Sequence, residues 1–255
     1  MGTWLRREDE IFNALPPDRQ ANIEIVLSAY RSVFAKKAYL THAVTTGKRF
    51  YDTLDHYEVT SAEELEHKRP GALYEEVILP NIEEARQLAK RIGSGAHALI
   101  VPGVFEARKQ RWTQDEYMVL WMRFITLGPV EELLLSPYWY YTNGGVMEFC
   151  RGMMIRFGLI QERQDLLPVL DHECNPVTLA EGAWMAADAI KQLTGRGHDT
   201  AKLRTELTQI AGIGAYLEDP LTDRHTPTRL AERDLYGAVR AAQSVGAPVA
   251  FHPAH

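Results

Sequence analysis

The chain of 255 residues contains little cysteine and no long apolar run. Its two cysteines, Cys150 and Cys174, form neither a CxxC pair nor a zinc-type spacing, so they predict no disulfide framework and no metal site. No segment approaches the ~20 apolar residues that span a bilayer. The first residues, MGTWLRREDEIF, lack the apolar core of a signal peptide. We therefore expect a soluble, cytoplasmic protein with no membrane partner.

Basic residues are also too few to form a block along the chain. Lys and Arg number 28 against 34 Asp and Glu, which gives a formal net charge of -6. Proteins that bind nucleic acids usually carry a clustered basic surface, so we expect no nucleic-acid polymer as partner. A small phosphorylated ligand needs only a few local cations, and the net charge does not exclude one.

Apolar patterning predicts strands that alternate with helices, and we find no internal repeat. The expected strands are residues 38–44, 97–101, 132–136 and 166–170. The expected helices are residues 19–34, 73–92, 112–127, 146–157, 179–193, 201–210 and 230–244. The charge-rich residues 52–70 are expected to form a loop or a short excursion.

This alternation predicts an α/β fold with a flavodoxin-like (Rossmann-like) parallel sheet flanked by helices. We expect three parts along the chain. They are a helical N-terminal extension over residues 1–35, an α/β catalytic core over residues 36–175 and a helical C-terminal extension over residues 176–255.

A polar turn follows the first expected strand. It contains hydroxyls, a glycine and two cations: Thr45, Thr46, Gly47, Lys48 and Arg49. These groups suit a phosphate monoester. The frame GxxxxGK[ST] of a P-loop is absent, and an ordinary surface turn is the alternative interpretation.

A second polar turn follows the third expected strand and leads into a helix. Its residues can cap the helix and allow a ligand to approach the backbone: Thr142, Asn143, Gly144 and Gly145. Glu148 follows between the apolar Met147 and Phe149. Ligands of parallel sheets bind where strand ends and helix starts meet, so Glu148 is our candidate catalytic residue. The alternative is an exposed Glu that the helix dipole favours.

Other side chains near these turns leave two interpretations open. Trp139 and Tyr141 are candidates to stack on a base, or they cover the edge of the sheet. Tyr39 lies inside the first strand and is more typical of a core residue. Four adjacent residues, Asp171 to Cys174, cannot all converge on one ion, so we expect a solvated loop and no metal there.

The turn THAVTTGKRF and the segment YWYYTNGGVMEF resemble the nucleoside 2-deoxyribosyltransferase-like superfamily, and the resemblance covers residues 37–170. That group includes nucleoside deoxyribosyltransferases, 2'-deoxynucleoside 5'-phosphate N-hydrolases and cytidylate N-glycosidases. The resemblance implies that Glu148 is the nucleophile or stabilises an oxocarbenium-like transition state. We expect the start of the helix to keep Glu148 ionised.

Two positions in the resemblance bear on the substrate and on a second acid. Relatives that act on free nucleosides carry Asp six residues before the catalytic Glu, whereas those that act on 5'-monophosphates carry Ser. This chain carries Thr142, which favours a monophosphate. The second acid of relatives lies about two dozen residues before the Glu, but Arg123 and Phe124 stand there. Asp115 is the nearest candidate, beside Glu116.

The expected function is therefore hydrolysis of the N-glycosidic bond of a nucleoside 5'-monophosphate, without a cofactor. The alternatives are a nucleoside (deoxy)ribosyltransferase, a non-catalytic nucleotide-binding sensor and an NAD glycohydrolase. The resemblance also implies a homodimer. In the first turn, His42 and Ala43 stand where many relatives have Gly.

Overall fold

The computed structural model describes residues 9–33, 35–93, 97–105, 113–128, 130–160, 166–218 and 236–247. Within these ranges four parallel strands form one sheet in the order β2-β1-β3-β4. They are β1 (Lys36–Thr41), β2 (His97–Ile100), β3 (Glu132–Leu135) and β4 (Val169–Asp171). The expected α/β class and parallel sheet are confirmed.

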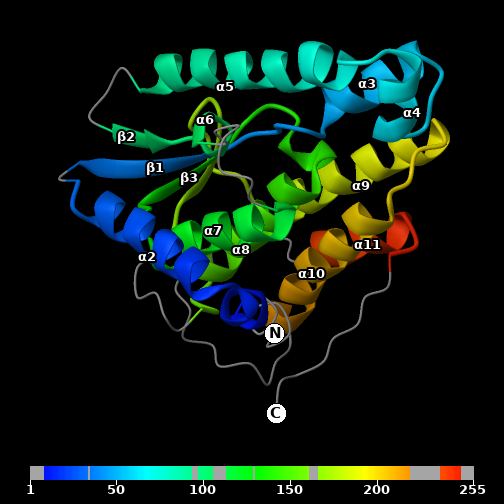
Figure 1. The fold of residues 1–255 in the computed structure, drawn as a ribbon. Coiled ribbons are helices and arrows are strands. Elements are labelled where there is room, and N and C mark those ends of the chain that lie inside the picture. Colours follow the sequence, from blue (N-terminus) through cyan, green and yellow to red (C-terminus); the bar gives the residue numbers. More distant parts are fainter. Residues whose placement is uncertain are drawn as a thin grey trace.

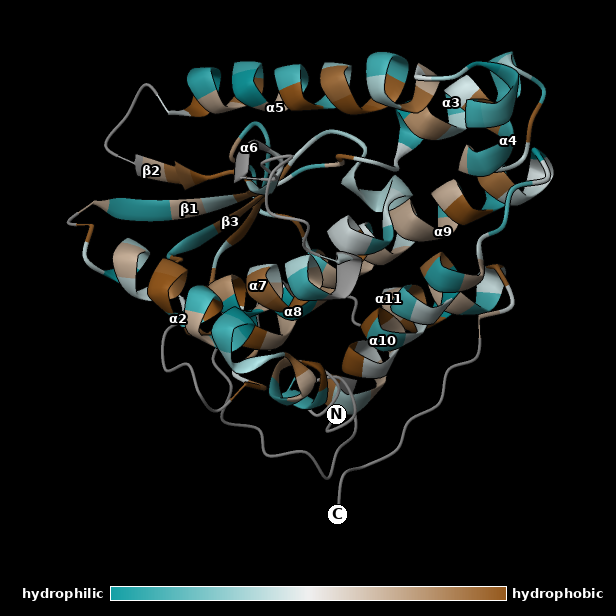
Figure 2. Cartoon of the chain, viewed as in Figure 1, coloured by the Kyte–Doolittle hydropathy of each residue, from teal (hydrophilic) through white to brown (hydrophobic). Residues whose placement is uncertain are grey.

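Helices cover both faces of the sheet (Figure 1). One face is covered by α5 (Leu79–Ile92), and the opposite face by α2 (Pro17–Arg31), α7 (Gln114–Leu127) and α8 (Asn143–Arg156). The helices α9 (Leu179–Gly195), α10 (Ala201–Glu218) and α11 (Tyr236–Ser244) pack together beside α8. In Figure 2, hydrophilic residues cover much of the outer side of α5.

Side chains along β1 alternate between the two faces, as the period of a strand requires. Ala38 and Leu40 belong to the apolar cluster that α5 covers. Tyr39 belongs to the larger cluster on the side of α7 and α8. This larger cluster also contains Leu27 near the N-terminus and Ile190 of α9, so all three expected parts of the chain contribute to one core. None of the described helices is both long and apolar enough to cross a bilayer.

The helix α8 lies unusually close to its neighbours because glycines occupy the contacts. A Cβ atom added at Gly152 would lie 2.4 Å from the side chain of Leu133 on β3. A Cβ atom added at Gly182 of α9 would lie 2.1 Å from the ring of Phe149. Real Cβ contacts are never this short, so larger residues at either position would push α8 away from the sheet or from α9.

The expectation of a loop over residues 52–70 is wrong. Two short helices, α3 (Lys48–His56) and α4 (Ala62–Lys68), occupy most of this region, and the π-helix η1 (Leu73–Ile78) leads from there into α5. Each short helix buries one leucine, Leu54 or Leu65, against Ala72. Helices of nine and seven residues are too short to repeat the apolar stripe by which a helix is recognised in a sequence.

The start of α7 at Gln114 is stabilised by its N-cap, Thr113. Thr113 accepts a hydrogen bond from the backbone N–H of Glu116, and the Glu116 carboxylate accepts one from the backbone N–H of Thr113. This reciprocal pair is a capping box, which satisfies two N–H groups that a helix start leaves open. Before α7, the short helix α6 (Pro102–Phe105) follows β2.

Candidate functional site

The turn after β1 and the turn after β3 are in direct contact. Gly47 has φ +106°, and a Cβ atom there would lie 2.8 Å from Cβ of Ala43 and 3.0 Å from Cγ2 of Thr142. Only glycine combines this backbone conformation with so close an approach. The meeting of the two turns at one edge of the sheet, which the sequence predicted, is therefore present.

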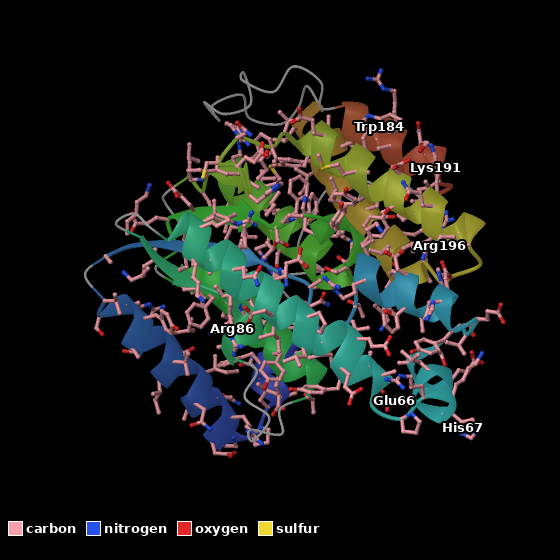
Figure 3. All side chains as sticks on the ribbon, turned by 90° about the horizontal axis from the view of Figure 1, so that it is seen from above. Glu66, His67, Arg86, Trp184, Lys191 and Arg196 are labelled. Atoms are coloured by element: carbon pink, nitrogen blue, oxygen red, sulfur yellow. The ribbon has the colours of Figure 1, made fainter. Side chains whose placement is uncertain are left out.

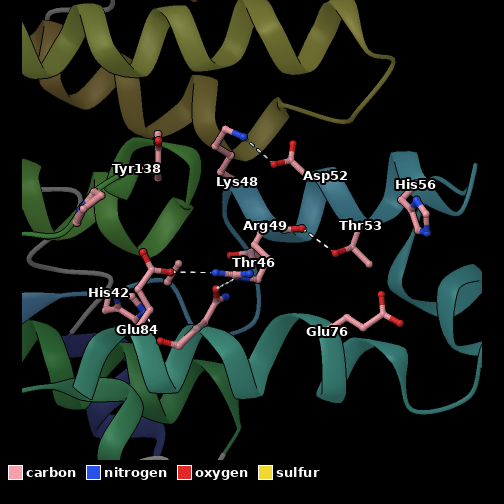
Figure 4. A pocket seen from close by; sticks show the side chains of 13 residues that line it. His42, Thr46, Lys48, Arg49, Asp52, Thr53, His56, Glu76, Glu84 and Tyr138 are labelled. Atoms are coloured by element: carbon pink, nitrogen blue, oxygen red, sulfur yellow. Dashed lines mark hydrogen bonds and ion pairs between the residues drawn. The ribbon is translucent and has the colours of Figure 1, made fainter. Parts of the chain in front are cut away.

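A cavity with a volume of about 430 Å³ lies beside this contact (Figure 4). Thr46, Lys48 and Arg49 line it, together with Tyr138 from the turn after β3. It lies between the ends of β1 and β3, where the chain order of the sheet reverses and where open α/β sheets bind their ligands. Its volume is within the range of small-molecule sites.

The two cations of this cavity are the first residues of α3 rather than parts of a loop, and both are paired with acids. Nζ of Lys48 lies 2.6 Å from a carboxylate oxygen of Asp52. Nη2 of Arg49 lies 3.1 Å from a carboxylate oxygen of Glu84. These side chains are about 40% exposed, and exposed ion pairs contribute little free energy, so an anionic ligand can replace the carboxylates at small cost.

The acid beside Lys48 has a second cation. Nη2 of Arg196 lies 3.0 Å from Oδ1 of Asp52, and the same guanidinium is paired with Asp55. Figure 3 shows Arg196 at the end of α9 that faces α3. Asp52 therefore stays compensated when Lys48 turns to another anion. This arrangement makes Lys48 the cation that is most easily released to a ligand.

The start of α8 assigns different roles to the residues of the second turn. The Thr142 hydroxyl accepts a hydrogen bond from the Gly145 N–H at 2.8 Å and donates one to the Trp139 carbonyl, so Thr142 is the N-cap. Asn143 is the first residue of the helix. A Cβ atom at Gly144 would meet no atom within 4 Å, which leaves room for a ligand at the helix start.

Glu148 is buried rather than exposed at the helix start. Its residue in α8 is 7% exposed. Tyr39 Oη donates a hydrogen bond of 2.6 Å to Oε1 of Glu148. Burial raises the pKa of Glu148 to about 8, against the opposing effect of the hydrogen bond from Tyr39. The carboxyl is therefore mainly protonated at neutral pH.

The expectation that the start of the helix keeps Glu148 ionised is wrong. Glu148 begins the second turn of α8, whereas the effect of the helix dipole falls off within the first turn. Loss of water around the carboxyl is the larger influence. The described residues that line the two large cavities do not include Glu148.

Tyr39 is the residue of this site whose role the sequence did not reveal. It is fully buried, as expected for a core residue, and its ring packs against Trp121 of α7 with centroids 6.3 Å apart. Its hydroxyl is nevertheless the hydrogen-bond partner of Glu148. The signal that could have found it is the strand period, which turns Tyr39 toward the helix that carries Glu148.

A second cavity, of about 700 Å³, opens at the carboxyl ends of β3 and β4. Tyr138 lines both cavities, is 48% exposed and has φ +61°, a conformation that is rare for residues other than glycine. Lys48 Nζ lies 5.7 Å from the centre of its ring. Tyr138 therefore presents an exposed aromatic ring to both cavities.

The two aromatic residues predicted as stacking candidates are mostly buried. Trp139 packs on Phe149 with ring centroids 4.6 Å apart and also lines the second cavity. Tyr141 donates a hydrogen bond of 2.6 Å to Gln192 of α9. Each is 4% exposed, so both rings cover the end of the sheet.

The second acid remains a prediction. Asp115 lies in the first turn of α7, but its side chain is outside the described part of the structure. Its neighbour Glu116 serves the capping box and pairs with Arg19 at 3.4 Å. Arg123, which stands where relatives have the acid, pairs with Glu24 at 3.2 Å.

The segment after β4 is a hydrogen-bonded loop. Asp171 Oδ1 accepts hydrogen bonds of 2.8 Å from the backbone N–H groups of Glu173 and Asn175. These bonds lower the pKa of Asp171, although partial burial opposes them. In the described ranges, no three His, Cys, Asp or Glu side chains come together in a way that could hold a metal ion.

Comparisons of the chain with protein-family models, with curated proteins and with solved structures gave no match. The interpretation of the site therefore rests on its geometry and on the motifs of the sequence.

Proposed function

We propose that the protein is an N-glycosidase that hydrolyses the N-glycosidic bond of a nucleoside 5'-monophosphate to free base and (deoxy)ribose 5-phosphate. The observation that carries this proposal is the buried hydrogen bond between Tyr39 of β1 and Glu148 of α8, a helix whose N-cap touches the cation-bearing turn. The sheet order β2-β1-β3-β4 equals that of the first four strands of a flavodoxin-like sheet, which supports the finer fold assignment.

Lys48 and Arg49 would bind the 5'-phosphate, with Thr46 donating a hydrogen bond from its hydroxyl. The open space at Gly144 lets phosphate or sugar oxygens approach the start of α8. Thr142 fits a phosphorylated substrate because it caps the helix without adding a negative charge. Tyr138 offers its exposed face to the ligand beside Lys48.

Glu148 would act on the anomeric carbon. As the bond to the base breaks, positive charge develops on the sugar and negative charge on the base. The carboxyl proton of Glu148 would pass to the departing base, and the carboxylate that remains would stabilise the charge on the sugar. A buried carboxylate stabilises such a charge more strongly than a solvated one does, because little water screens the interaction. The hydroxyl of Tyr39 holds the carboxyl in one orientation and opposes the rise in its pKa.

Two further parts of the proposal concern the setting of the enzyme. A homodimer remains a proposal from the resemblance. Trp184 and Met185 of α9 are each 41% exposed, and Met185 lines the second cavity, which offers an apolar surface for a second copy. Analytical ultracentrifugation distinguishes monomer from dimer.

A cytoplasmic location also remains a proposal, supported by two free cysteines.

A chromatographic screen tests the proposed function. The purified protein is incubated with each common nucleoside, with its 5'-monophosphate and with NAD, and free base is measured. The control variant is Glu63→Gln, which removes an exposed carboxylate of α4. We expect base release from monophosphates by the wild type and by Glu63→Gln, and loss of release in Glu148→Gln.

Other outcomes would contradict the proposal. Release from free nucleosides alone would exclude the monophosphate, and nicotinamide release from NAD alone would identify an NAD glycohydrolase. Formation of a new nucleotide after a second base is added would identify a transferase. Ligand binding without any base release would identify a sensor.

A further inference from the structure

One carboxylate is shared between a cation of the cavity and a cation outside it. Oδ2 of Asp52 lies 2.6 Å from Nζ of Lys48, and Oδ1 of Asp52 lies 3.0 Å from Nη2 of Arg196. Lys48 and Asp52 are among the described residues that line the cavity of about 430 Å³, whereas Arg196 is not (Figure 4). The two oxygens of Asp52 therefore link the cavity to the end of α9.

The end of α9 holds Arg196 in a defined place. The backbone N–H of Gly197 donates to the carbonyl of Thr194, and that of His198 donates to the carbonyl of Leu193, both at 3.0 Å. Gly197 has φ +85°, which glycine adopts without strain. This pair of bonds is the Schellman motif, which ends many helices. It fixes the backbone that follows Arg196.

The same turn is attached to α3 by contacts that do not involve Lys48. Nε2 of His198 lies 2.8 Å from Oδ1 of Asp55, and the guanidinium of Arg196 pairs with the other oxygen of this carboxylate. The buried ring of His198 also packs on the ring of Tyr51, with centroids 5.0 Å apart. Arg196 therefore stays beside α3 when Lys48 leaves its carboxylate.

We propose that Arg196 is a positioning residue of the anion site, which holds Asp52 while Lys48 turns from Asp52 to the phosphate of a ligand. The inference rests on the phosphate site of the proposed function. Without Arg196, Asp52 would lose one of its two cations. It would then hold Lys48 more strongly and repel a phosphate in the cavity that it lines. Arg196 thus raises the affinity for an anion through a carboxylate that lies between them.

Titration calorimetry with ribose 5-phosphate and with inorganic phosphate tests this inference. Neither probe has a glycosidic bond, so the protein keeps its native Glu148. We expect Arg196→Gln to bind both probes about threefold to fivefold more weakly, in the range that one exposed ion pair contributes. Arg196→Lys should lose less affinity because it keeps the charge. The difference should shrink at high salt, which screens exposed charges.

Two comparisons separate this role from a general effect on the fold. Lys191→Gln removes a cation of the same helix that lies over the ring of Trp184, and it should leave the affinity unchanged. In a protein that carries Asp52→Asn, no carboxylate at this position competes for Lys48. Arg196→Gln should therefore have little effect on affinity when it is combined with Asp52→Asn.

Several results would overturn the inference. An equal loss of affinity with and without Asp52→Asn would show that Arg196 only stabilises α3. Unchanged affinity in Arg196→Gln alone would exclude any role in anion binding. If Arg196→Gln does not fold, the same comparison is made with Arg196→Lys, whose single ammonium cannot replace the two-sided contacts of the guanidinium.

The inference and the proposed function can fail separately. If the wild type binds neither probe, the inference is overturned, while base release by the wild type would still support the glycosidase. If both probes bind with the expected dependence on Arg196 and Asp52, the inference holds even when no nucleotide releases its base.

Discussion

Replacement of Glu148 by Gln should stabilise the protein, and the gain should grow as the pH rises. Burial raises the pKa of Glu148 from 4.5 to about 8. Between these values the unfolded chain has lost a proton that the folded chain retains, so each pH unit lowers the free energy of unfolding. Below pH 4.5 the Glu148 carboxyl is protonated in both the folded and the unfolded state, so it does not lower the free energy of unfolding. Above about 8 both are ionised and the penalty is complete.

The size of this effect follows from the interval between the two pKa values. Each pH unit changes the free energy of unfolding by about 1.4 kcal/mol. The interval from 4.5 to about 8 therefore corresponds to a loss on the order of 5 kcal/mol. This is a large share of the roughly 5–15 kcal/mol that stabilises a typical domain. Gln avoids the loss because it is neutral at every pH and its oxygen can accept the hydrogen bond from Tyr39.

Urea denaturation followed by tryptophan fluorescence measures this difference. The wild type, Glu148→Gln and the control Glu63→Gln are compared at a series of pH values from acidic to above 8. All other titrating groups are shared, so their contributions cancel in the difference between proteins. A stabilisation by Glu148→Gln that does not change with pH, or that grows toward acid, would refute the reasoning, since it would show that Glu148 is ionised in the folded protein.

Three further predictions test the helix cap of α8, the exposure of the two cysteines and the packing of α8. Thr142→Asp should keep the helix cap, because Asp is also a good N-cap, but its negative charge should weaken binding of a nucleoside monophosphate more than binding of the free nucleoside. Titration calorimetry with both ligands measures this difference. Equal losses of affinity for the two ligands would contradict a phosphate near this position. A thiol reagent should modify Cys174 in the folded protein and Cys150 only after denaturation, because Cys150 is buried and burial raises its pKa to about 12. Modification of both cysteines in the native state would contradict the structure. Gly152→Ala should lower the free energy of unfolding by about 1–3 kcal/mol, because the added Cβ atom overlaps a side chain of β3. Gly144→Ala, where the added atom meets open space, should change it by less than about 1 kcal/mol. Urea denaturation of both variants measures the difference, and equal effects would refute the packing described for α8.

The sequence predicted the elements that combine strong apolar patterning with clear ends. The helix α7 begins at Gln114 after its N-cap Thr113, and the capping box is visible in the sequence as a Thr followed three residues later by Glu116. The strand β1 is buried along almost its whole length, and a run of apolar residues predicts such a strand. The short helices α3 and α4 escaped prediction because they span only nine and seven residues and are rich in charge.

Prediction of the site went as far as the contact between two turns and no further. A strand end followed by polar residues and glycines placed Gly47 and Thr142 at one edge of the sheet, where they do touch. The protonation of Glu148 was not predictable, because it depends on how much water the surrounding helices exclude. The bond from Tyr39 joins residues 109 positions apart, which no local pattern encodes.

The most direct test of the proposed function is the initial rate of free-base release from a nucleoside 5'-monophosphate by the wild type and by Glu148→Gln, assayed side by side with both proteins folded. The account predicts measurable release by the wild type, much slower release from the matching free nucleoside, and a decrease of about a hundredfold or more in the variant. Equal rates for the two proteins, or no release from any monophosphate by the wild type, would contradict it.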